Sequence, residues 1–92
     1  MDQAMKERWI TALRSGKYPQ GRGELVTAEG NYCCLGVLCV VEGVEIPRDT
    51  MTSYLPKPLD TVFPGRENLI LSDMNDKGQS FAEIADWIEI NL

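Results

Sequence analysis

The feature that most constrains the fold is a run of nine consecutive apolar residues and glycine, CCLGVLCVV, at positions 33–41. The run is too short to span a bilayer, which takes roughly 18 or more apolar residues. It predicts a segment that is buried on all sides, as either a strand or a central helix. We favour a helix over residues 34–42, because the run exceeds an average strand and Gly43 follows where a C-cap belongs.

Helical patterns lie on both sides of this run. Apolar residues recur with a 3.6-residue period in residues 2–14, which predicts an N-terminal helix. Near the other end, Ser80 and Glu83 have the spacing of a capping box, in which each side chain bonds the other residue's backbone N–H. They predict a helix over residues 80–92. A shorter helical pattern at 69–75 precedes it, so the chain is expected to end in a helical hairpin.

Strands are expected between the first two helices. Residues 25–27 and 32–33 read as two short strands, and Gly30 is suited to the positive φ of a tight turn between them. These features predict a β-hairpin. In the proline-rich stretch that follows, we expect a short edge strand at 52–55 and a short helix at 58–63.

Together these elements predict a small α+β fold in a single domain, residues 1–92. Its parts are an N-terminal helix, a β-hairpin, a buried central helix and a C-terminal helical hairpin. A hydrophobic content of 43% and a charged content of 25% are typical of globular chains. We find no signal peptide or membrane span and expect a cytoplasmic protein without membrane contact, with homo-oligomerisation left open.

The residues that are missing exclude several kinds of chemistry. The chain has no histidine, which removes Ser-His-Asp and Cys-His catalysis and histidine-ligated metals. Its three cysteines, Cys33, Cys34 and Cys39, lack a fourth ligand for a closed zinc site and are expected to be small buried hydrophobes. We therefore predict no catalytic residue, no metal and no cofactor, and a protein that is not an enzyme.

Charge is distributed unevenly along the chain. Residues 1–23 carry five basic and two acidic side chains, whereas residues 24–92 carry four basic and twelve acidic ones. The basic part includes a glycine-rich segment, residues 16–23, whose exposed backbone N–H groups and cations suit an anion, with an aromatic ring for stacking. The predicted ligand-binding residues are Arg14, Lys17, Tyr18, Gln20 and Arg22.

Two other site types are considered at the acidic end of the chain. Residues 73–78 imitate the start of an EF-hand loop, but Lys77 and Ile84 stand where calcium ligands are required. The helical hairpin could also be a helix-turn-helix, but its second helix has no basic residue to meet DNA phosphates. Direct DNA binding is therefore not expected. The acids could instead imitate nucleic-acid phosphates toward a protein partner, through Asp73, Asp76, Glu83, Asp86 and Glu89.

Three motifs together carry a resemblance to a known group of proteins. They are WxxALRSGKYxQGxG at residues 9–23, YCCLGVLC at residues 32–39 and NDxGxSFxEIADxIE at residues 75–89. The chain resembles a family of small proteins encoded by tailed bacteriophages and prophages, and residues 44–68 are the least alike. The resemblance implies an accessory phage protein that acts in the bacterial cytoplasm. By analogy of class it is similar to inhibitors of host defence, among them anti-CRISPR proteins and sponges for cyclic-nucleotide signals.

These observations lead to two functional hypotheses. The first is a non-enzymatic counter-defence protein that sequesters an anionic, nucleotide-like signal molecule at the basic glycine-rich segment. The alternative is an acidic protein inhibitor, a nucleic-acid mimic that binds a host defence protein. The first needs affinity without chemistry, so the missing histidine is no obstacle to it.

Overall fold

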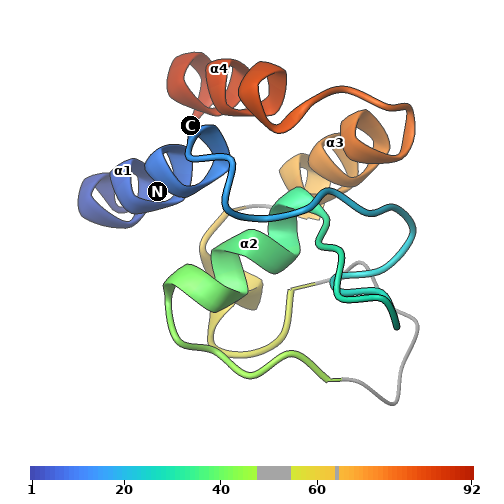
Figure 1. Cartoon of the computed structure of the whole chain (residues 1–92). Helices are drawn as coiled ribbons and strands as arrows, with labels where there is room; N and C mark the ends of the chain where they lie inside the picture. Colours follow the sequence, from blue (N-terminus) through green and yellow to red (C-terminus); the bar gives the residue numbers. More distant parts are fainter. Residues whose placement is uncertain (48–54, 64) are drawn as a thin grey trace.

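The computed structural model describes residues 1–47, 55–63 and 65–92. These residues form four α-helices and one short 3-10 helix, η1 (Figure 1). The α-helices are α1 (Gln3–Arg14), α2 (Cys34–Val41), α3 (Gly65–Asp76) and α4 (Phe81–Asn91), and η1 spans Leu59–Thr61.

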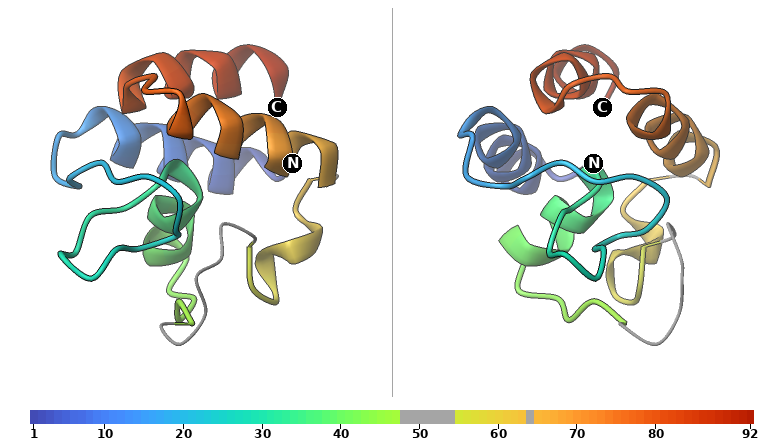
Figure 2. Two further views of the ribbon diagram at one scale, coloured as in Figure 1. Left: turned by 90° about the vertical axis from the view of Figure 1, so that its right-hand side faces the viewer. Right: turned by 45° about the vertical axis from the view of Figure 1, so that its right-hand side comes forward.

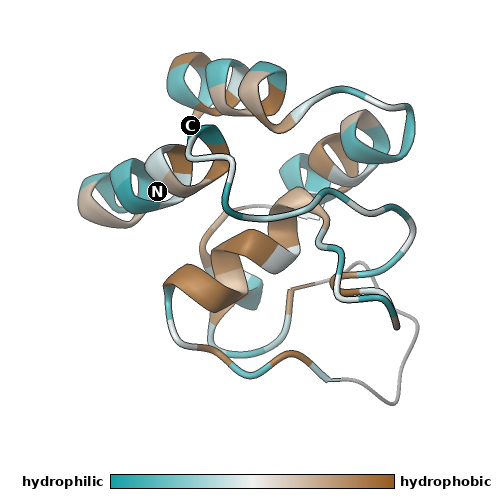
Figure 3. Cartoon of the chain, in the orientation of Figure 1, coloured by the Kyte–Doolittle hydropathy of each residue, from teal (hydrophilic) through white to brown (hydrophobic). Residues whose placement is uncertain are grey.

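Helix α2 lies at the centre of the arrangement, as its composition predicts. Figure 3 shows it as apolar over most of its length, and six of its eight residues are buried. It packs between α1 and α3, while α4 packs against both α1 and α3 and closes the bundle (Figure 2). The two chain ends lie near each other in all three views (Figures 1 and 2).

Trp9 on α1 anchors the core next to α2. Its side chain is fully buried, and its indole Nε1–H donates to the carbonyl oxygen of Cys34 at 2.9 Å. Its ring also stacks on Phe63, with 5.9 Å between the ring centroids. A buried tryptophan needs a partner for its N–H, and this hydrogen bond fixes α1 against the first turn of α2.

The predicted β-hairpin is wrong, and with it the α+β fold class: the described residues are helical and include no strand. Val26 and Tyr32 make only an isolated antiparallel bridge, and Tyr32 makes a second, parallel one with Gln20. The backbone N–H of Tyr32 donates to Pro19 O at 2.7 Å, and its carbonyl accepts from Gly21 N at 2.7 Å. The two backbone hydrogen bonds that flank the antiparallel bridge are present, Thr27 N to Asn31 O at 2.8 Å and Cys33 N to Leu25 O at 3.2 Å, but the pairing extends no further than this one bridge.

The burial of two neighbouring residues also argues against a β-hairpin. Leu25 and Val26 are both buried, whereas a strand in a one-sided hairpin would turn consecutive side chains to opposite faces. Leu25 follows the surface of α2 instead, where Gly36 lets the two backbones approach closely. The segment is therefore a wrapped loop rather than half of a sheet.

The other expected elements agree more closely with the structure. The capping box is confirmed: Ser80 Oγ accepts from Glu83 N at 3.2 Å, and Glu83 Oε1 accepts from Ser80 N at 2.9 Å. The helical hairpin is present, although α3 begins at Gly65, four residues earlier than expected. The helix expected at 58–63 appears as η1. The edge strand expected at 52–55 lies, apart from Leu55, outside the described residues.

Candidate functional site

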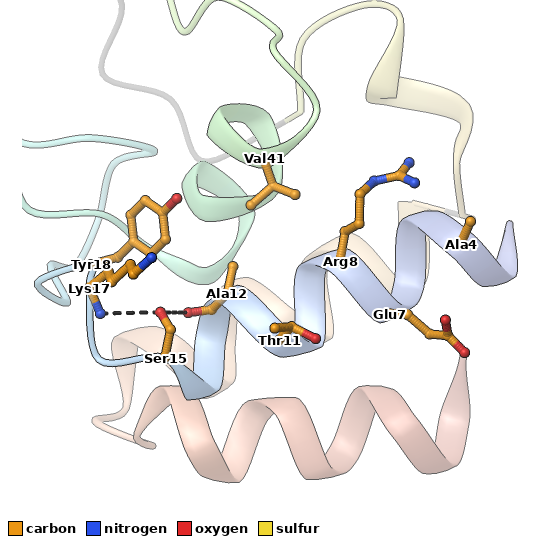
Figure 4. A pocket seen from close by; sticks show the side chains of 9 residues that line it. All are labelled: Ala4, Glu7, Arg8, Thr11, Ala12, Ser15, Lys17, Tyr18 and Val41. Carbon is orange, nitrogen blue, oxygen red and sulfur yellow. Dashed lines mark hydrogen bonds between the residues drawn. The ribbon is translucent and has the colours of Figure 1, made fainter.

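A groove with a cavity volume of about 530 Å³ lies along the outer face of α1 (Figure 4). We call it the α1 groove. Its walls come from α1, from the glycine-rich segment and from the last residue of α2. The lining residues are Ala4, Glu7, Arg8, Thr11, Ala12, Ser15, Lys17, Tyr18 and Val41.

The helical period of α1 explains the shape of the groove. Asp2 caps the helix by accepting from Met5 N at 2.8 Å, and the buried face of α1 carries Trp9 and Leu13. Lining residues such as Ala12 and Thr11 have short side chains, which leave room above the helix backbone. None of the α1 residues of this lining was predicted from the sequence to bind a ligand.

The basic and aromatic end of the groove is built by the turn after α1. Ser15 Oγ donates to Ala12 O at 2.6 Å and accepts from Lys17 N at 3.2 Å. Gly16 adopts a positive φ of 76°, a conformation that favours glycine. This turn brings Lys17 and Tyr18 to the groove (Figure 4). The Tyr18 ring is held edge to face against Tyr32, with ring centroids 5.8 Å apart.

Arg8 lines the same groove but is held by an acid. Its Nε and Nη2 donate to the two carboxylate oxygens of Glu42, each at 2.8 Å. The Glu42 side chain is only 11% exposed, whereas that of Arg8 is 51% exposed. This bidentate hydrogen bonding lowers the pKa of Glu42 and raises that of Arg8. The pair therefore stays ionised, and its two charges cancel.

Of the five predicted site residues, Lys17 and Tyr18 line the α1 groove and the other three lie elsewhere. Arg14 binds two acids of α4, with Nη2 2.7 Å from Asp86 Oδ1 and Nη1 3.0 Å from Glu89 Oε2. These hydrogen bonds raise the pKa of Arg14. Arg14 lines an adjoining hollow of about 480 Å³ between α1 and α4, which shares Glu7 and Thr11 with the α1 groove.

Gln20 and Arg22 contact the turn between α3 and α4. Gln20 Nε2 donates to Asn75 Oδ1 at 3.1 Å and to Gln79 O at 2.7 Å. Arg22 lies over Gly78, since a Cβ at that glycine would be 2.8 Å from Arg22 Nη2. These two side chains therefore help to hold the glycine-rich segment against the helix bundle.

The residue that organises this attachment, Asn75, was not predicted as a site residue from the sequence, where it belongs to the EF-hand imitation and to the motif at 75–89. Its side chain is fully buried, and besides the bond from Gln20, its Oδ1 accepts from Cys34 N at 3.2 Å. Its Nδ2 donates to Gly21 O at 2.7 Å. An asparagine beside the apolar positions Leu71 and Met74 of a helix was the available signal, because a buried amide must find partners.

The acids considered for nucleic-acid mimicry are all engaged within the chain. Asp73 pairs with Lys77 at 2.9 Å, and Asp76 accepts from the backbone N–H of Gly23 at 2.9 Å. Glu83 closes the capping box, and the remaining two, Asp86 and Glu89, bind Arg14. Several of them are still exposed, but each also has an internal partner.

The cysteines are free and buried, as expected. Burial raises the pKa of all three thiols, that of Cys39 to about 12. A thiol with a raised pKa holds little of the reactive thiolate. Within the described ranges, no three histidine, cysteine or acidic side chains are grouped as a metal site would require. The helices in those ranges are also too short or too polar to cross a bilayer.

Comparison with family models gives a match over the first part of the chain. Residues 1–51 match the model of the family described as "Domain of unknown function (DUF8296)". The chain belongs to the DUF8296 family. The match to DUF8296 covers α1, the glycine-rich segment and α2, and so it includes every residue named above as lining the α1 groove. Neither the curated proteins nor the solved structures give a match.

Proposed function

We propose that the protein is a non-enzymatic binding protein that holds a small anionic, nucleotide-like molecule in the α1 groove. The observation that carries this proposal is the meeting of Lys17 and Tyr18 at one end of the groove. A volume of about 530 Å³ also falls within the range of small-molecule sites, roughly 300–1,000 Å³.

The lining supplies a complementary group for each part of such a ligand. The Lys17 ammonium pairs with a phosphate, since charge-assisted hydrogen bonds are among the stronger ones. The Tyr18 ring contacts a planar base, and the apolar floor formed by Ala12 and Val41 covers its edge. The hydroxyl of Thr11 is available to a sugar.

Sequestration requires affinity and no chemical step. A lining of cations, one carboxylate, hydroxyls and apolar groups is sufficient for it. In the setting that the sequence resemblance implies, an accessory phage protein in the bacterial cytoplasm would act by removing a nucleotide signal of the host's defence. The proposed role is therefore counter-defence by binding.

The alternative is an acidic inhibitor that imitates nucleic acid toward a host defence protein. It has less support, because Asp86 and Glu89 share Arg14 and the other acids considered have backbone or lysine partners. A partner would have to compete with these contacts. Each acid of this set already has a partner within the chain, so none is free for a host protein.

Calorimetry tests the proposal directly. The protein is titrated with cyclic and linear nucleotides at physiological salt, and the best binder is measured again with Lys17→Ala and Tyr18→Ala. We expect Lys17→Ala to weaken binding roughly tenfold or more, and Tyr18→Ala to weaken it by about 1–3 kcal/mol.

Lys77→Ala is the matched control, because it also removes one exposed lysine charge but lies in the turn after α3, outside the groove lining. It should bind like the native protein. Absence of heat with every nucleotide would refute the proposal. Equal losses from Lys17→Ala and Lys77→Ala would also refute it, because they would show a general charge effect and no site.

A further inference from the structure

We infer that the α1 groove selects ligands with a single negative charge, and that Glu42 sets this selectivity by occupying Arg8. The preferred class is then a phosphodiester-type nucleotide over one with a terminal phosphate or a polyphosphate. This inference rests on the proposed function, since it specifies which anions the same groove holds.

The charges at the groove carry the argument. Among the described lining residues the charged side chains are Lys17, Arg8 and Glu7. Arg8 is held at 2.8 Å by both oxygens of Glu42, so its charge is already balanced. Lys17 is then the one lining cation whose side chain makes no ion pair with an acid in the described part of the chain. Its hydrogen bond to Ser15 is made by the backbone N–H.

The opposite end of the groove is acidic. Glu7 lies on α1 two turns before Ser15, which is about 12 Å along the helix axis. Figure 4 shows it at the other end of the lining from Lys17 and Tyr18. A ligand that extends along the groove therefore places its anion near Lys17. Any further negative charge on the ligand would be repelled by Glu7.

These charges discriminate between phosphate types. A phosphodiester carries one negative charge, which Lys17 alone balances. A terminal phosphate carries about 1.5 to 2 negative charges at pH 7, and a polyphosphate carries more. The additional charge finds no cation at the groove and meets a chain whose net charge is -5.

Glu42 is the residue on which this selectivity depends. It lies outside the groove lining, at the C-cap of α2, and its carboxylate is largely covered. Without its charge, the Arg8 guanidinium would become a second effective cation in the lining. Glu42→Gln should therefore shift the groove toward more highly charged ligands while keeping a similar side-chain shape.

The first experiment uses the native protein. Cyclic AMP, AMP, ATP and neutral adenosine, and the corresponding guanine series, are titrated by calorimetry at one ionic strength. We expect the cyclic nucleotide to bind roughly tenfold or more tightly than adenosine and than ATP. Equal affinity for ATP or for adenosine would overturn the inference but leave a nucleotide-binding groove. No binding in either series would overturn the proposed function itself.

The second experiment uses charge-matched variants. Glu42→Gln should raise ATP affinity roughly tenfold relative to cyclic AMP, whereas Glu45→Gln, an exposed control with the same change in charge, should not. An equal shift in both variants, or no shift in either, would contradict the role of Glu42. If Glu42→Gln does not fold, Glu7→Gln replaces it. That variant removes the exposed acid of the lining and should raise ATP affinity relative to cyclic AMP, and no change would overturn the charge argument.

Discussion

Replacing Gly36 by alanine should be among the most damaging small changes in this protein. Gly36 lies in the buried helix α2, and an added Cβ would fall on the carbonyl oxygen of Leu25, with the Leu25 carbonyl carbon only 2.8 Å away. Leu25 is 1% exposed. Its carbonyl also accepts from Cys33 N at 3.2 Å. The obstacle is thus backbone that is held from both sides, and no rotamer change relieves it.

The expected loss can be estimated from these contacts. Overpacking of a core site destabilises by about 1–3 kcal/mol, with the upper end expected for a backbone contact. Displacing Leu25 also weakens its hydrogen bond with Cys33, worth about 1 kcal/mol. The higher helix propensity of alanine returns about 1 kcal/mol. Gly36→Ala should therefore lower the free energy of unfolding by roughly 3 kcal/mol, which corresponds to about 15 °C in Tm.

Urea titration followed by circular dichroism measures this loss, and Gly65→Ala is the matched control. Gly65 begins helix α3, is exposed, and has nothing within 4 Å of an added Cβ. That variant should be neutral or more stable by up to about 1 kcal/mol. If Gly36→Ala also proved neutral, the close approach of Leu25 to α2 would be wrong, and with it the wrapped path of the loop.

Three further predictions concern the contacts that hold the bundle together. Asn75→Ala removes a fully buried amide with its hydrogen bonds and should lower the free energy of unfolding by about 3 kcal/mol in denaturant titration; a loss below about 1 kcal/mol would contradict its bonding role. Ser80→Ala removes the cap on Glu83 N and should lower it by about 1 kcal/mol, and no change would mean that α4 does not begin there. The hydrogen bond from Arg8 lowers the pKa of Glu42 in the folded protein. The stability that this bond adds is therefore present above the pKa of Glu42 in the unfolded chain, and it is lost as the pH falls through the lower pKa of Glu42 in the folded protein. Unfolding measured between about pH 5 and pH 3 should therefore show a smaller acid loss in Glu42→Gln than in the native protein, and equal losses would contradict the pairing.

Local sequence signals predicted part of the fold correctly. The apolar run at 33–41 is the central helix, because a segment without a polar face can only be buried. The Ser80 and Glu83 capping box starts α4 as expected, since both of its hydrogen bonds join residues three apart.

The predicted hairpin failed for a reason that local sequence does not contain. Gly30 does have the positive φ of a turn, 83°. However, the antiparallel pairing stops at the single bridge between Val26 and Tyr32, and Leu25 approaches α2 at Gly36. Strand propensity over a few residues cannot weigh such competing partners.

The candidate site likewise has features that the local sequence indicates and features that only the folded structure shows. Lys17 and Tyr18 were predicted as site residues from the glycine-rich turn, and both line the α1 groove, where Lys17 is exposed and Tyr18 is partly buried against the core. Arg14 was counted as a free cation, but its acidic partners, Asp86 and Glu89, follow it by 72 and 75 residues. Counting the charges along the sequence cannot show which cations already form ion pairs with acids in the folded protein.

The central claim is that the α1 groove binds an anionic nucleotide at Lys17 and Tyr18. An NMR titration of the 15N-labelled protein with cyclic AMP tests it most directly. We expect the amide signals of Thr11, Ser15, Lys17 and Tyr18 to shift together and to saturate at one site. Shifts confined to residues outside the groove, such as those around Arg22, or no saturable shift at all, would contradict it.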